Sequence, residues 1–429
     1  MRIMKDSGIE WVKDIPSTWD VAYLSAVLSE RKNKNIGMKE NNLLSLSYGN
    51  VIRKDITTND GLLPESFEGY NIIEKDDIVL RLTDLQNDHR SLRTGLCKER
   101  GIITSAYCTL KKNSSKYDSR FLQYYLHSFD ICKGFYGMGA GVRQGLNYDG
   151  IRKIEILLPP LAEQIAIADC IEEKTKKVDA LIANQEAQIE KLKAYKQSLI
   201  TEVVTKGLNP NVPMKSSGVE AIGSIPQHWK IYRTKFVADA IFKGNGITKD
   251  EVVEDGDIQC IRYGEIYSKY DGSFEKTYSR TNESAITSPQ YISSGDILFA
   301  GTGELVEEIG KNVVYTGKEP CLAGGDIIVL KHSQNPIFLN YALYCTSSQT
   351  QKSKGKAKLK VVHISASEIG NVIIALPPLD EQNAIAEYLD KKCEHISRLI
   401  EIKKKKIESL TQYKKSLIYE YVTGKKEVM

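Results

Sequence analysis

The sequence lacks the hallmarks of membrane and secreted proteins. No apolar stretch approaches the roughly 20 residues of a transmembrane helix, and charges occupy the N-terminus where a signal peptide needs an apolar segment. The eight cysteines form no C-x-x-C pair and no Cys/His cluster. This pattern fits buried thiols in a reducing compartment and argues against a structural zinc site. We therefore expect a cytoplasmic protein without a bound metal.

Motifs of nucleotide-dependent and DNA-modifying enzymes are also missing. The chain has no G-x-x-x-x-G-K-[ST] loop and no H-E-x-x-H motif. Its Pro-Pro pairs stand in "LPPL", not in the [N/D]-P-P-[F/Y/W] element with which a methyltransferase grips a flipped base. "FAGTG" (Phe299–Gly303) resembles a loop that binds S-adenosylmethionine, but glycine patterns this short are common by chance. We expect no catalytic residues, although a DNA methyltransferase in its own right remains an alternative.

The charge is nearly balanced, with 59 Lys and Arg against 55 Asp and Glu and a net charge of +4. This excess is too small to indicate a nucleic-acid partner, so any DNA-binding surface must be local. At 429 residues the chain is too long for one ordinary core, which predicts two or more domains.

Internal repetition is the main signal in the sequence. "MKDSGIEWVKDIPSTW" (Met4–Trp19) returns as "MKSSGVEAIGSIPQHW" (Met214–Trp229) at an offset of 210. Residues 159–207 return at 377–425, an offset of 218 without a gap, with nearly half of the positions identical. The chain is therefore a tandem duplication. We call residues 4–19 and 214–229 the opening segments, and we interpret Trp19 and Trp229 as structural anchors.

Each 218-offset segment is predicted to form one long helix. Pro-Pro precedes it, Glu163 or Glu381 falls in its first turn, and Gly207 or Gly424 ends it. About 45 residues correspond to roughly 65 Å, and a helix of that length needs a partner along its side. Apolar heptad positions predict a coiled coil. The seam residues are Ile171, Val178, Gln185, Leu192 and Leu199 in the first helix, and Leu389, Ile396, Lys403, Leu410 and Leu417 in the second.

The seam has one polar interruption in each helix, at Gln185 and at Lys403. If the helices are antiparallel, their midpoints meet, and a polar pair there would fix the register. Alternatively, both side chains only reach out to solvent. Tyr195 and Tyr413 are expected to widen the apolar stripe.

Between the repeated parts, residues 20–155 and 230–373 share only fragments. "SYGNV" (Ser47–Val51) resembles "RYGEI" (Arg262–Ile266), and "EKDDIVLR" (Glu74–Arg81) resembles "SSGDILFA" (Ser293–Ala300). "TSAYCTLK" (Thr104–Lys111) has a looser counterpart in "GGDIIVLK" (Gly324–Lys331). Short β-rich runs bounded by Gly, Asn and Asp predict mixed α/β domains. Two copies of the same repeated segments that enclose different variable regions suit a protein that recognises two unlike half-sites.

These repeats resemble the specificity subunit of a type I restriction–modification system. The resemblance rests on the doubled opening segment, the doubled "PPLAEQ"/"PPLDEQ" helix start and the doubled "Y-K-x-S-L-I-x-E" helix end. It implies an α+β fold with two mixed α/β target-recognition domains in a pseudo-twofold tandem repeat, separated by two long helices packed as an antiparallel coiled coil. The domains expected are 1–155 and 208–373, and the helices 156–207 and 374–429.

The same resemblance implies a non-catalytic chain that reads a bipartite, asymmetric site in double-stranded DNA. Two DNA-methyltransferase subunits, which would carry the S-adenosylmethionine, and restriction or translocase subunits are the implied partners. The helical pair would set the half-site spacing and dock the methyltransferase subunits. A coiled-coil scaffold without a DNA role remains the second alternative. The sequence leaves the DNA motif, its spacer and the methylated base open.

Side chains that suit base edges or phosphates define the candidate DNA contacts. Lysines at alternate positions from 352 to 360 would line one side of an extended segment and could follow phosphates. The candidates in the first domain are Tyr48, Asn50, Gln86, Asn87, His89, Arg90, Arg93, Arg143 and Gln144. Those in the second are Arg262, Tyr263, Glu265, Lys352, Lys354, Lys356, Lys358 and Lys360.

Overall fold

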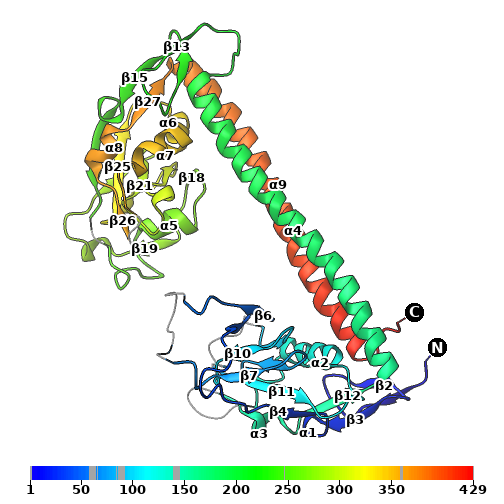
Figure 1. Cartoon of the computed structure of the whole chain (residues 1–429). Coiled ribbons are helices and arrows are strands. Elements are labelled where there is room, and N and C mark those ends of the chain that lie inside the picture. Colours follow the sequence, from blue (N-terminus) through cyan, green and yellow to red (C-terminus); the bar gives the residue numbers. More distant parts are fainter. Residues whose placement is uncertain are drawn as a thin grey trace. The chain divides into compact units, whose positions relative to one another are not determined.

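The computed structural model describes residues 2–57, 64, 66–83, 85, 92–138, 145–245, 247–357 and 361–428. The chain divides into two compact units, Met1–Glu186 with Lys404–Met429 (unit 1) and Ala187–Lys403 (unit 2). Each unit holds one variable region and part of both long helices, α4 (Leu161–Lys206) and α9 (Leu379–Val422) (Figure 1). The division into four domains remains a prediction. The predicted domain limits at residues 155 and 373 are the first residues of strands β12 (Glu155–Leu158) and β27 (Ile373–Leu376).

The opening segments have the same structure in both units. β1 (Met4–Asp6) pairs with β2 (Asp14–Pro16), and β13 (Met214–Ser216) pairs with β14 (Ser224–Pro226) in the matching register. Trp19 and Trp229, which follow the two hairpins, are fully buried. The indole Nε1–H of each donates to a carboxylate in the first turn of a long helix, Glu163 at 3.0 Å and Glu381 at 2.9 Å. The interpretation of both tryptophans as anchors is confirmed.

The C-terminal ends of both long helices pack against opening segments. Gly207 and Gly424 follow α4 and α9 with φ of 77° and 70°, the left-handed conformation that favours glycine at this position. A Cβ on Gly424 would lie 2.4 Å from a Pro16 carbon, and one on Gly207 would lie 3.2 Å from Trp229. The second helix therefore ends beside the N-terminal segment in unit 1, as the first ends beside the second opening segment in unit 2.

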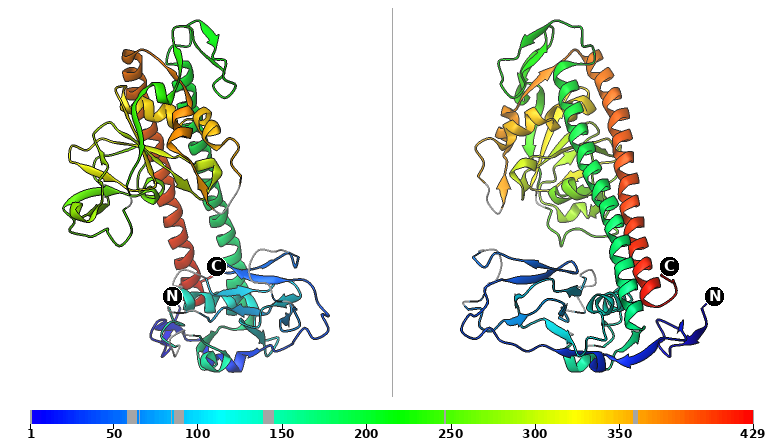
Figure 2. Two further views of the ribbon diagram at one scale, coloured as in Figure 1. Left: turned by 90° about the vertical axis from the view of Figure 1, so that its left-hand side faces the viewer. Right: turned by 45° about the vertical axis from the view of Figure 1, so that its right-hand side comes forward.

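The two long helices are antiparallel in each unit (Figures 1 and 2). α4 has 46 residues and α9 has 44. In unit 1 the core joins Ile171 near the start of α4 to Leu417 near the end of α9. In unit 2 it joins Ile200 near the end of α4 to Leu389 near the start of α9. The predicted combination of mixed α/β domains with an antiparallel helical pair is confirmed.

The variable region of unit 1 is built on an antiparallel sheet with the strand order β4-β11-β8-β9. Helix α2 (Ser119–Ile131) begins at Asp118, whose side chain accepts from two backbone N–H groups. Its apolar face joins the sheet and both long helices in one core. The strands and other helices are β3 (Asp20–Tyr23), α1 (Leu24–Val27), β4 (Leu28–Glu30), β5 (Leu44–Ser47), β6 (Asn50–Arg53), β7 (Asn71–Ile73), β8 (Ile78–Leu80), β9 (Thr94–Leu96), β10 (Gly101–Ile103), β11 (Cys108–Lys112) and α3 (Tyr148–Ile151).

The variable region of unit 2 contains a five-stranded mixed sheet, β16-β25-β21-β23-β18, and a four-stranded sheet, β19-β17-β24-β20. Both faces of the larger sheet are buried, because Ile297 and Phe299 of β21 enter one core while Leu298 and Ala300 enter another. The strands of this variable region are β15 (Lys230–Arg233), β16 (Ala238–Lys243), β17 (Ile258–Ile261), β18 (Ser273–Phe274), β19 (Ser279–Thr281), β20 (Tyr291–Ile292), β21 (Ile297–Ala300), β22 (Thr302–Gly303), β23 (Asn312–Tyr315), β24 (Cys321–Ala323), β25 (Ile327–His332) and β26 (Val362–His363). Its helices are η1 (Thr234–Phe236), α5 (Tyr263–Ser268), η2 (Glu283–Ala285), η3 (Val306–Glu308), α6 (Pro336–Tyr344), α7 (Thr346–Ser353) and α8 (Ala366–Asn371).

Two of the three shared fragments occupy matching places in the two units. Asp77 and Asp296 each accept the backbone N–H three residues earlier, at 2.8 Å, just before β8 and β21. β11 then pairs with β8 as β25 pairs with β21. The third fragment differs, because Tyr48-Gly49 turns a hairpin whereas Tyr263-Gly264 begins helix α5.

No helix in the described part of the chain is long and apolar enough to span a bilayer. Six of the eight cysteines are buried, while Cys132 is exposed and Cys170 is half-buried.

Candidate functional site

The β5–β6 hairpin turn presents two of the candidate base contacts in unit 1. Tyr48 and Gly49 have φ of 45° and 79°, the backbone of the two-residue turn that best fits strand twist. The Tyr48 side chain is 84% exposed. Asn50 is exposed as well, and its Nδ2 donates to the carbonyl of Tyr48 at 3.3 Å. The turn thus holds a phenol and an amide outside the domain core.

Arg93 has an internal role instead of a surface one. It is fully buried, and its Nη1 donates to the carbonyls of Arg81 and Thr83 at 3.1 and 2.7 Å. Its Nε donates to the hydroxyl of Tyr136 at 3.1 Å. The guanidinium therefore satisfies the loop backbone and is not available to a base. Gln86, Asn87, His89, Arg90, Arg143 and Gln144 lie outside the described residues.

In unit 2 the "RYGE" residues divide between an internal and an exposed role. Glu265 is buried and accepts from the backbone N–H of Arg262 at 2.8 Å and from the hydroxyl of Ser279 at 2.5 Å. It caps helix α5 and cannot also reach a base. Tyr263 is 38% exposed. Arg262 and Tyr263 line a hollow of about 630 Å³ together with Lys243, Lys249 and Lys269.

The lysine-rich segment before β26 does not form the regular row that alternation predicts. Lys352 lies in helix α7 and is buried, where its Nζ donates to the carbonyl of Gly310 at 2.7 Å. Burial lowers the pKa of Lys352 to about 7. Lys356 pairs with Glu368 at 2.7 Å, whereas Lys354 is exposed. Lys358 and Lys360 lie outside the described residues. Lys352 is therefore a core residue, and the phosphate row is wrong at that position.

The seam residues of the helical pair differ in burial. Ile171, Val178, Leu389, Ile396 and Leu417 are buried, while Gln185, Leu192, Leu199, Lys403 and Leu410 are half-buried. Lys403 donates to the side-chain carbonyl of Gln188 on the facing helix. The polar position of α9 is thus hydrogen-bonded across the pair one turn away from Gln185. Tyr195 and Tyr413 are 56% and 53% exposed and do not widen the apolar stripe.

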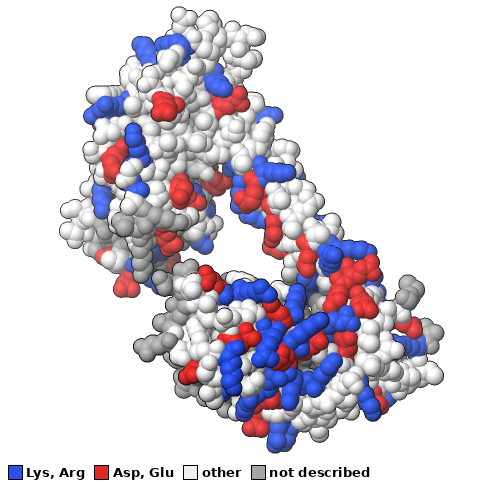
Figure 3. Space-filling model, viewed as in Figure 1, with Lys and Arg blue, Asp and Glu red and all other residues white. Residues whose placement is uncertain are grey.

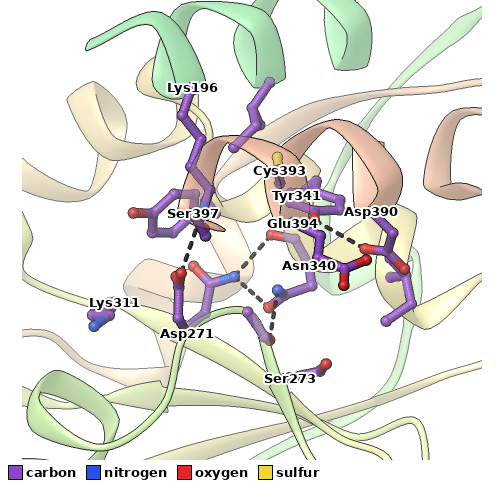
Figure 4. A pocket seen from close by; sticks show the side chains of 15 residues that line it. Lys196, Asp271, Ser273, Lys311, Asn340, Tyr341, Asp390, Cys393, Glu394 and Ser397 are labelled. Atoms are coloured by element: carbon purple, nitrogen blue, oxygen red, sulfur yellow. Dashed lines mark hydrogen bonds and ion pairs between the residues drawn. The ribbon is translucent and has the colours of Figure 1, made fainter. Parts of the chain in front are cut away.

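A pair of cavities beside the long helices was not found by the sequence analysis. The unit 1 cavity, about 740 Å³, lies between α2 and the helical pair, and Tyr48 and Asn50 reach its lining. The unit 2 cavity, about 410 Å³, lies between α6 and the helical pair (Figure 4). The cavities could have been found by aligning the two long helices at the offset of 218. Some helix positions outside the seam, which line both cavities, differ in charge between the two repeats.

No group of three or more metal-ligating side chains occurs among the residues that the structure describes.

Comparisons with known proteins identify chains of similar sequence and fold. The family model described as "Type I restriction modification DNA specificity domain" matches residues 17–191 and 226–412. The type I restriction enzyme MjaVIII specificity subunit of Methanocaldococcus jannaschii is 26% identical over 420 residues, which cover 96% of this chain and 93% of the relative. The EcoBI specificity subunit of Escherichia coli is 22% identical over 381 residues, covering 85% and 74%.

A solved structure supports the same fold. A chain from a study of complex assembly and conformational transition in a type I restriction–modification system superposes with a TM-score of 0.69. It is 17% identical, and the alignment covers 95% of this chain and 98% of the other.

Proposed function

Since this chain belongs to the type I restriction–modification DNA specificity family and is a specificity subunit, we propose that each of its variable regions reads one half of a bipartite DNA site. A specificity subunit is the DNA-recognition component of its complex and not the catalytic one. The family match does not favour the two alternatives, a methyltransferase in its own right and a scaffold without a DNA role.

One observation carries the proposal of two different readers. Both units hold their variable region in the same frame, with the hairpin of the opening segment and the Trp19–Glu163 or Trp229–Glu381 hydrogen bond. Within that frame unit 1 has a four-stranded antiparallel sheet, while unit 2 has a five-stranded mixed sheet and a second sheet. Shared anchoring with unlike surfaces supports the recognition of two unlike half-sites.

The exposure of the candidate residues reduces the number of proposed base contacts. Tyr48 and Asn50 in unit 1, and Arg262 and Tyr263 in unit 2, keep their place as proposed contacts because they line hollows and are at least partly accessible. Lys354 is proposed as a phosphate contact, because it is exposed. Phosphate contacts position the protein on the duplex, and base contacts supply the sequence preference.

The proposed complex contains two methyltransferase subunits docked on the helical pair, each carrying its own S-adenosylmethionine, and optional restriction subunits. Its DNA target implies a cytoplasmic location. The test is methyl transfer from labelled S-adenosylmethionine to genomic DNA, measured for the purified chain alone and after reconstitution with its methyltransferase subunit. We expect transfer only by the reconstituted complex. Transfer by the chain alone would contradict the assignment.

Exchange of one variable region tests the division of labour. Replacing residues 20–155 by the equivalent region of a relative should alter one half-site and leave the other intact. Sequencing of methylated positions in the host genome measures both half-sites at once. A change in both halves would contradict the two-reader proposal.

A further inference from the structure

The cavities beside the helical pair are the same structural feature in the two repeats. α2 and α6, which form one wall in each unit, are attached to the long helix in the same way. Gln164 accepts the backbone N–H of Asp118 at 2.9 Å, and Gln382 accepts that of Asn335 at 3.1 Å. The lining residues of the long helices then match at an offset of 218: Glu172 and Asp390, Thr175 and Cys393, Lys176 and Glu394, Asp179 and Ser397, Lys196 and Lys414, Ile200 and Ile418.

The two cavities carry opposite charge. Five cationic side chains and two carboxylates line the cavity of unit 1, in addition to His127. Two cationic side chains and three carboxylates line that of unit 2. On the helices the charge is reversed at Lys176, which corresponds to Glu394, while Lys415 corresponds to the uncharged Gln197. Lys and Arg side chains are also prominent on the face of unit 1 in Figure 3.

In unit 2 the polar groups of the cavity pair with one another (Figure 4). Lys196 on α4 reaches across to Asp271 of the variable region at 2.9 Å and donates to Ser397 of α9 at 3.1 Å. The hydroxyl of Tyr341 donates to Asp390 at 2.9 Å. These contacts tie the variable region to both helices and engage Lys196. The second lysine of the cavity, Lys311, donates to the carbonyls of Tyr267 and Tyr270 at 3.3 and 3.5 Å.

In unit 1 several cations remain available. Lys414 pairs with Asp179 at 2.7 Å, and Arg120 pairs with Asp118 and other carboxylates. Lys98, Lys176 and Lys415 make no ion pair within the described ranges of the chain. Their ammonium groups therefore line the cavity without a direct ion pair to a carboxylate of the described residues.

His127 lies in the wall of the unit 1 cavity. Burial lowers the pKa of His127 to about 4, and the neighbouring charges of Lys414 and Lys415 act in the same direction. Its Nδ1 lies 3.4 Å from the hydroxyl of Thr94. The imidazole is thus neutral at neutral pH and adds a polar, uncharged wall beside the lysines.

We propose that the cavity of unit 1 binds backbone phosphates of DNA beside the half-site read by residues 20–155, and that the matching cavity of unit 2 does not. This inference rests on the proposed function. DNA is the fitting occupant because the exposed Tyr48 and Asn50 line the same cavity as Lys176 and Lys415. A phosphate held by the lysines would place the adjoining base edges within reach of the hairpin turn. The final helix of the chain thereby contributes to the DNA contacts of its first domain.

The test uses the complex with its methyltransferase subunits and a duplex that contains the methylated site found by sequencing. Binding is measured at several salt concentrations for the wild type and for the double variant Lys176→Gln/Lys415→Gln. Each lost phosphate contact should reduce the slope of log K against log salt by about 0.9, so the double variant should lose roughly 1.8. Binding to an unrelated duplex should weaken by a similar factor.

Two matched variants serve as controls. Lys176→Arg keeps the charge and should keep the wild-type slope. Glu394→Gln changes the charge by one unit, in the opposite direction to Lys176→Gln, at the matching position of unit 2 and should leave the slope unchanged. A slope that responds to Glu394→Gln as strongly as to Lys176→Gln would overturn the asymmetry between the units.

Duplexes with single methylphosphonate linkages, which lack the phosphate charge, locate the contact. At one or two positions beside the first half-site, the uncharged linkage should weaken wild-type binding and should not weaken binding by the double variant any further. Equal additional losses in both proteins at every position would overturn the proposal.

The outcomes separate this inference from the proposed function. A wild-type complex without preference for its methylated site would contradict the proposed function itself. A wild-type complex that has this preference, together with an unchanged slope in the double variant, would overturn only the cavity assignment. Loss of methyltransferase-subunit binding in the double variant, with an unchanged slope, would assign the cavity to a protein partner and would also overturn it.

Discussion

Trp19 donates its indole N–H to Glu163 across 144 positions of sequence, and the two side chains join the opening segment of the chain to the start of its first long helix. Trp229 and Glu381 repeat the contact in unit 2. Because the indoles are fully buried, each carboxylate satisfies a donor that has no access to water. The contact explains why the opening segment and the helix start recur together.

Removing this acceptor should destabilise unit 1. In Glu163→Ala the buried indole N–H loses its acceptor, which costs about 1–3 kcal/mol. Urea unfolding followed by tryptophan fluorescence measures the loss. Glu163→Gln keeps an acceptor oxygen and should lose less. Glu381→Ala should produce a matching loss of stability in unit 2. If Glu163→Ala unfolds at the same urea concentration as the wild type, the anchoring role is contradicted.

Lys354 and Lys356, in the segment before β26, should respond differently to substitution. Lys354→Gln removes an exposed charge, so it should reduce the salt slope of DNA binding by up to about 0.9 without a change in stability. Lys356→Gln breaks the pair with Glu368 and a hydrogen bond to the carbonyl of His363. It should therefore cost about 0.5–1.5 kcal/mol in the free energy of unfolding. An unchanged slope in Lys354→Gln would show that the side chain is only solvated.

The pKa of His127 predicts acid sensitivity in unit 1. The folded-state pKa of about 4 lies below the ordinary value of 6.5, so the unfolded chain binds the proton more readily. Stability should thus fall as the pH drops from about 6.5 to about 4, by up to roughly 3 kcal/mol at 1.36 kcal/mol per unit.

The variant His127→Asn removes the titrating group and keeps a polar side chain beside Thr94. Urea unfolding at several pH values should show a flatter stability profile for this variant between pH 6.5 and pH 4. His395→Gln, at an exposed position of α9, is the control and should follow the wild-type profile. A His127→Asn profile that parallels the wild type would contradict the prediction.

Insertion of one heptad into α4 near Gln185 should lengthen the spacer of the DNA site. Seven residues add roughly 10 Å and keep the apolar stripe in phase. On DNA this is at most about three base pairs at 3.4 Å each. The half-sites themselves should stay the same, since no residue moves within a variable region. Sequencing of methylated positions in cells with the insertion variant measures both, and an unchanged spacer would show that the helices do not set the distance.

The duplication and the helical pair were readable from the sequence for physical reasons. A long helix repeats its environment every 3.6 residues, so its apolar seam shows in the spacing of Ile171, Val178 and their counterparts. A turn closed by a local hydrogen bond also keeps a short sequence pattern, which is why the turns at Asp77 and Asp296 could be matched from fragments of a few residues.

The tertiary structure decided which polar side chains face outward. Arg93, Glu265 and Lys352 are residue types that often contact DNA. In this fold each one instead forms hydrogen bonds with buried backbone or hydroxyl groups of the protein. Sequence cannot reveal this, because these partners lie 12, 14 and 42 positions away along the chain and only the fold brings them into contact. Tyr48-Gly49 and Tyr263-Gly264 show the same limit, since the first pair forms the turn between β5 and β6 and the second begins the capped helix α5.

The sequence by itself determined the repeat, the two long helices, the anchoring tryptophans and the family resemblance, since these depend on local spacing and on the comparison of one half with the other. Only the tertiary structure brought Lys176 of α4, Lys415 of α9 and the hairpin of Tyr48 to one cavity. The potential in that cavity is a sum over charges that lie close together in space and hundreds of residues apart in sequence, and distance in space is what sets their interaction.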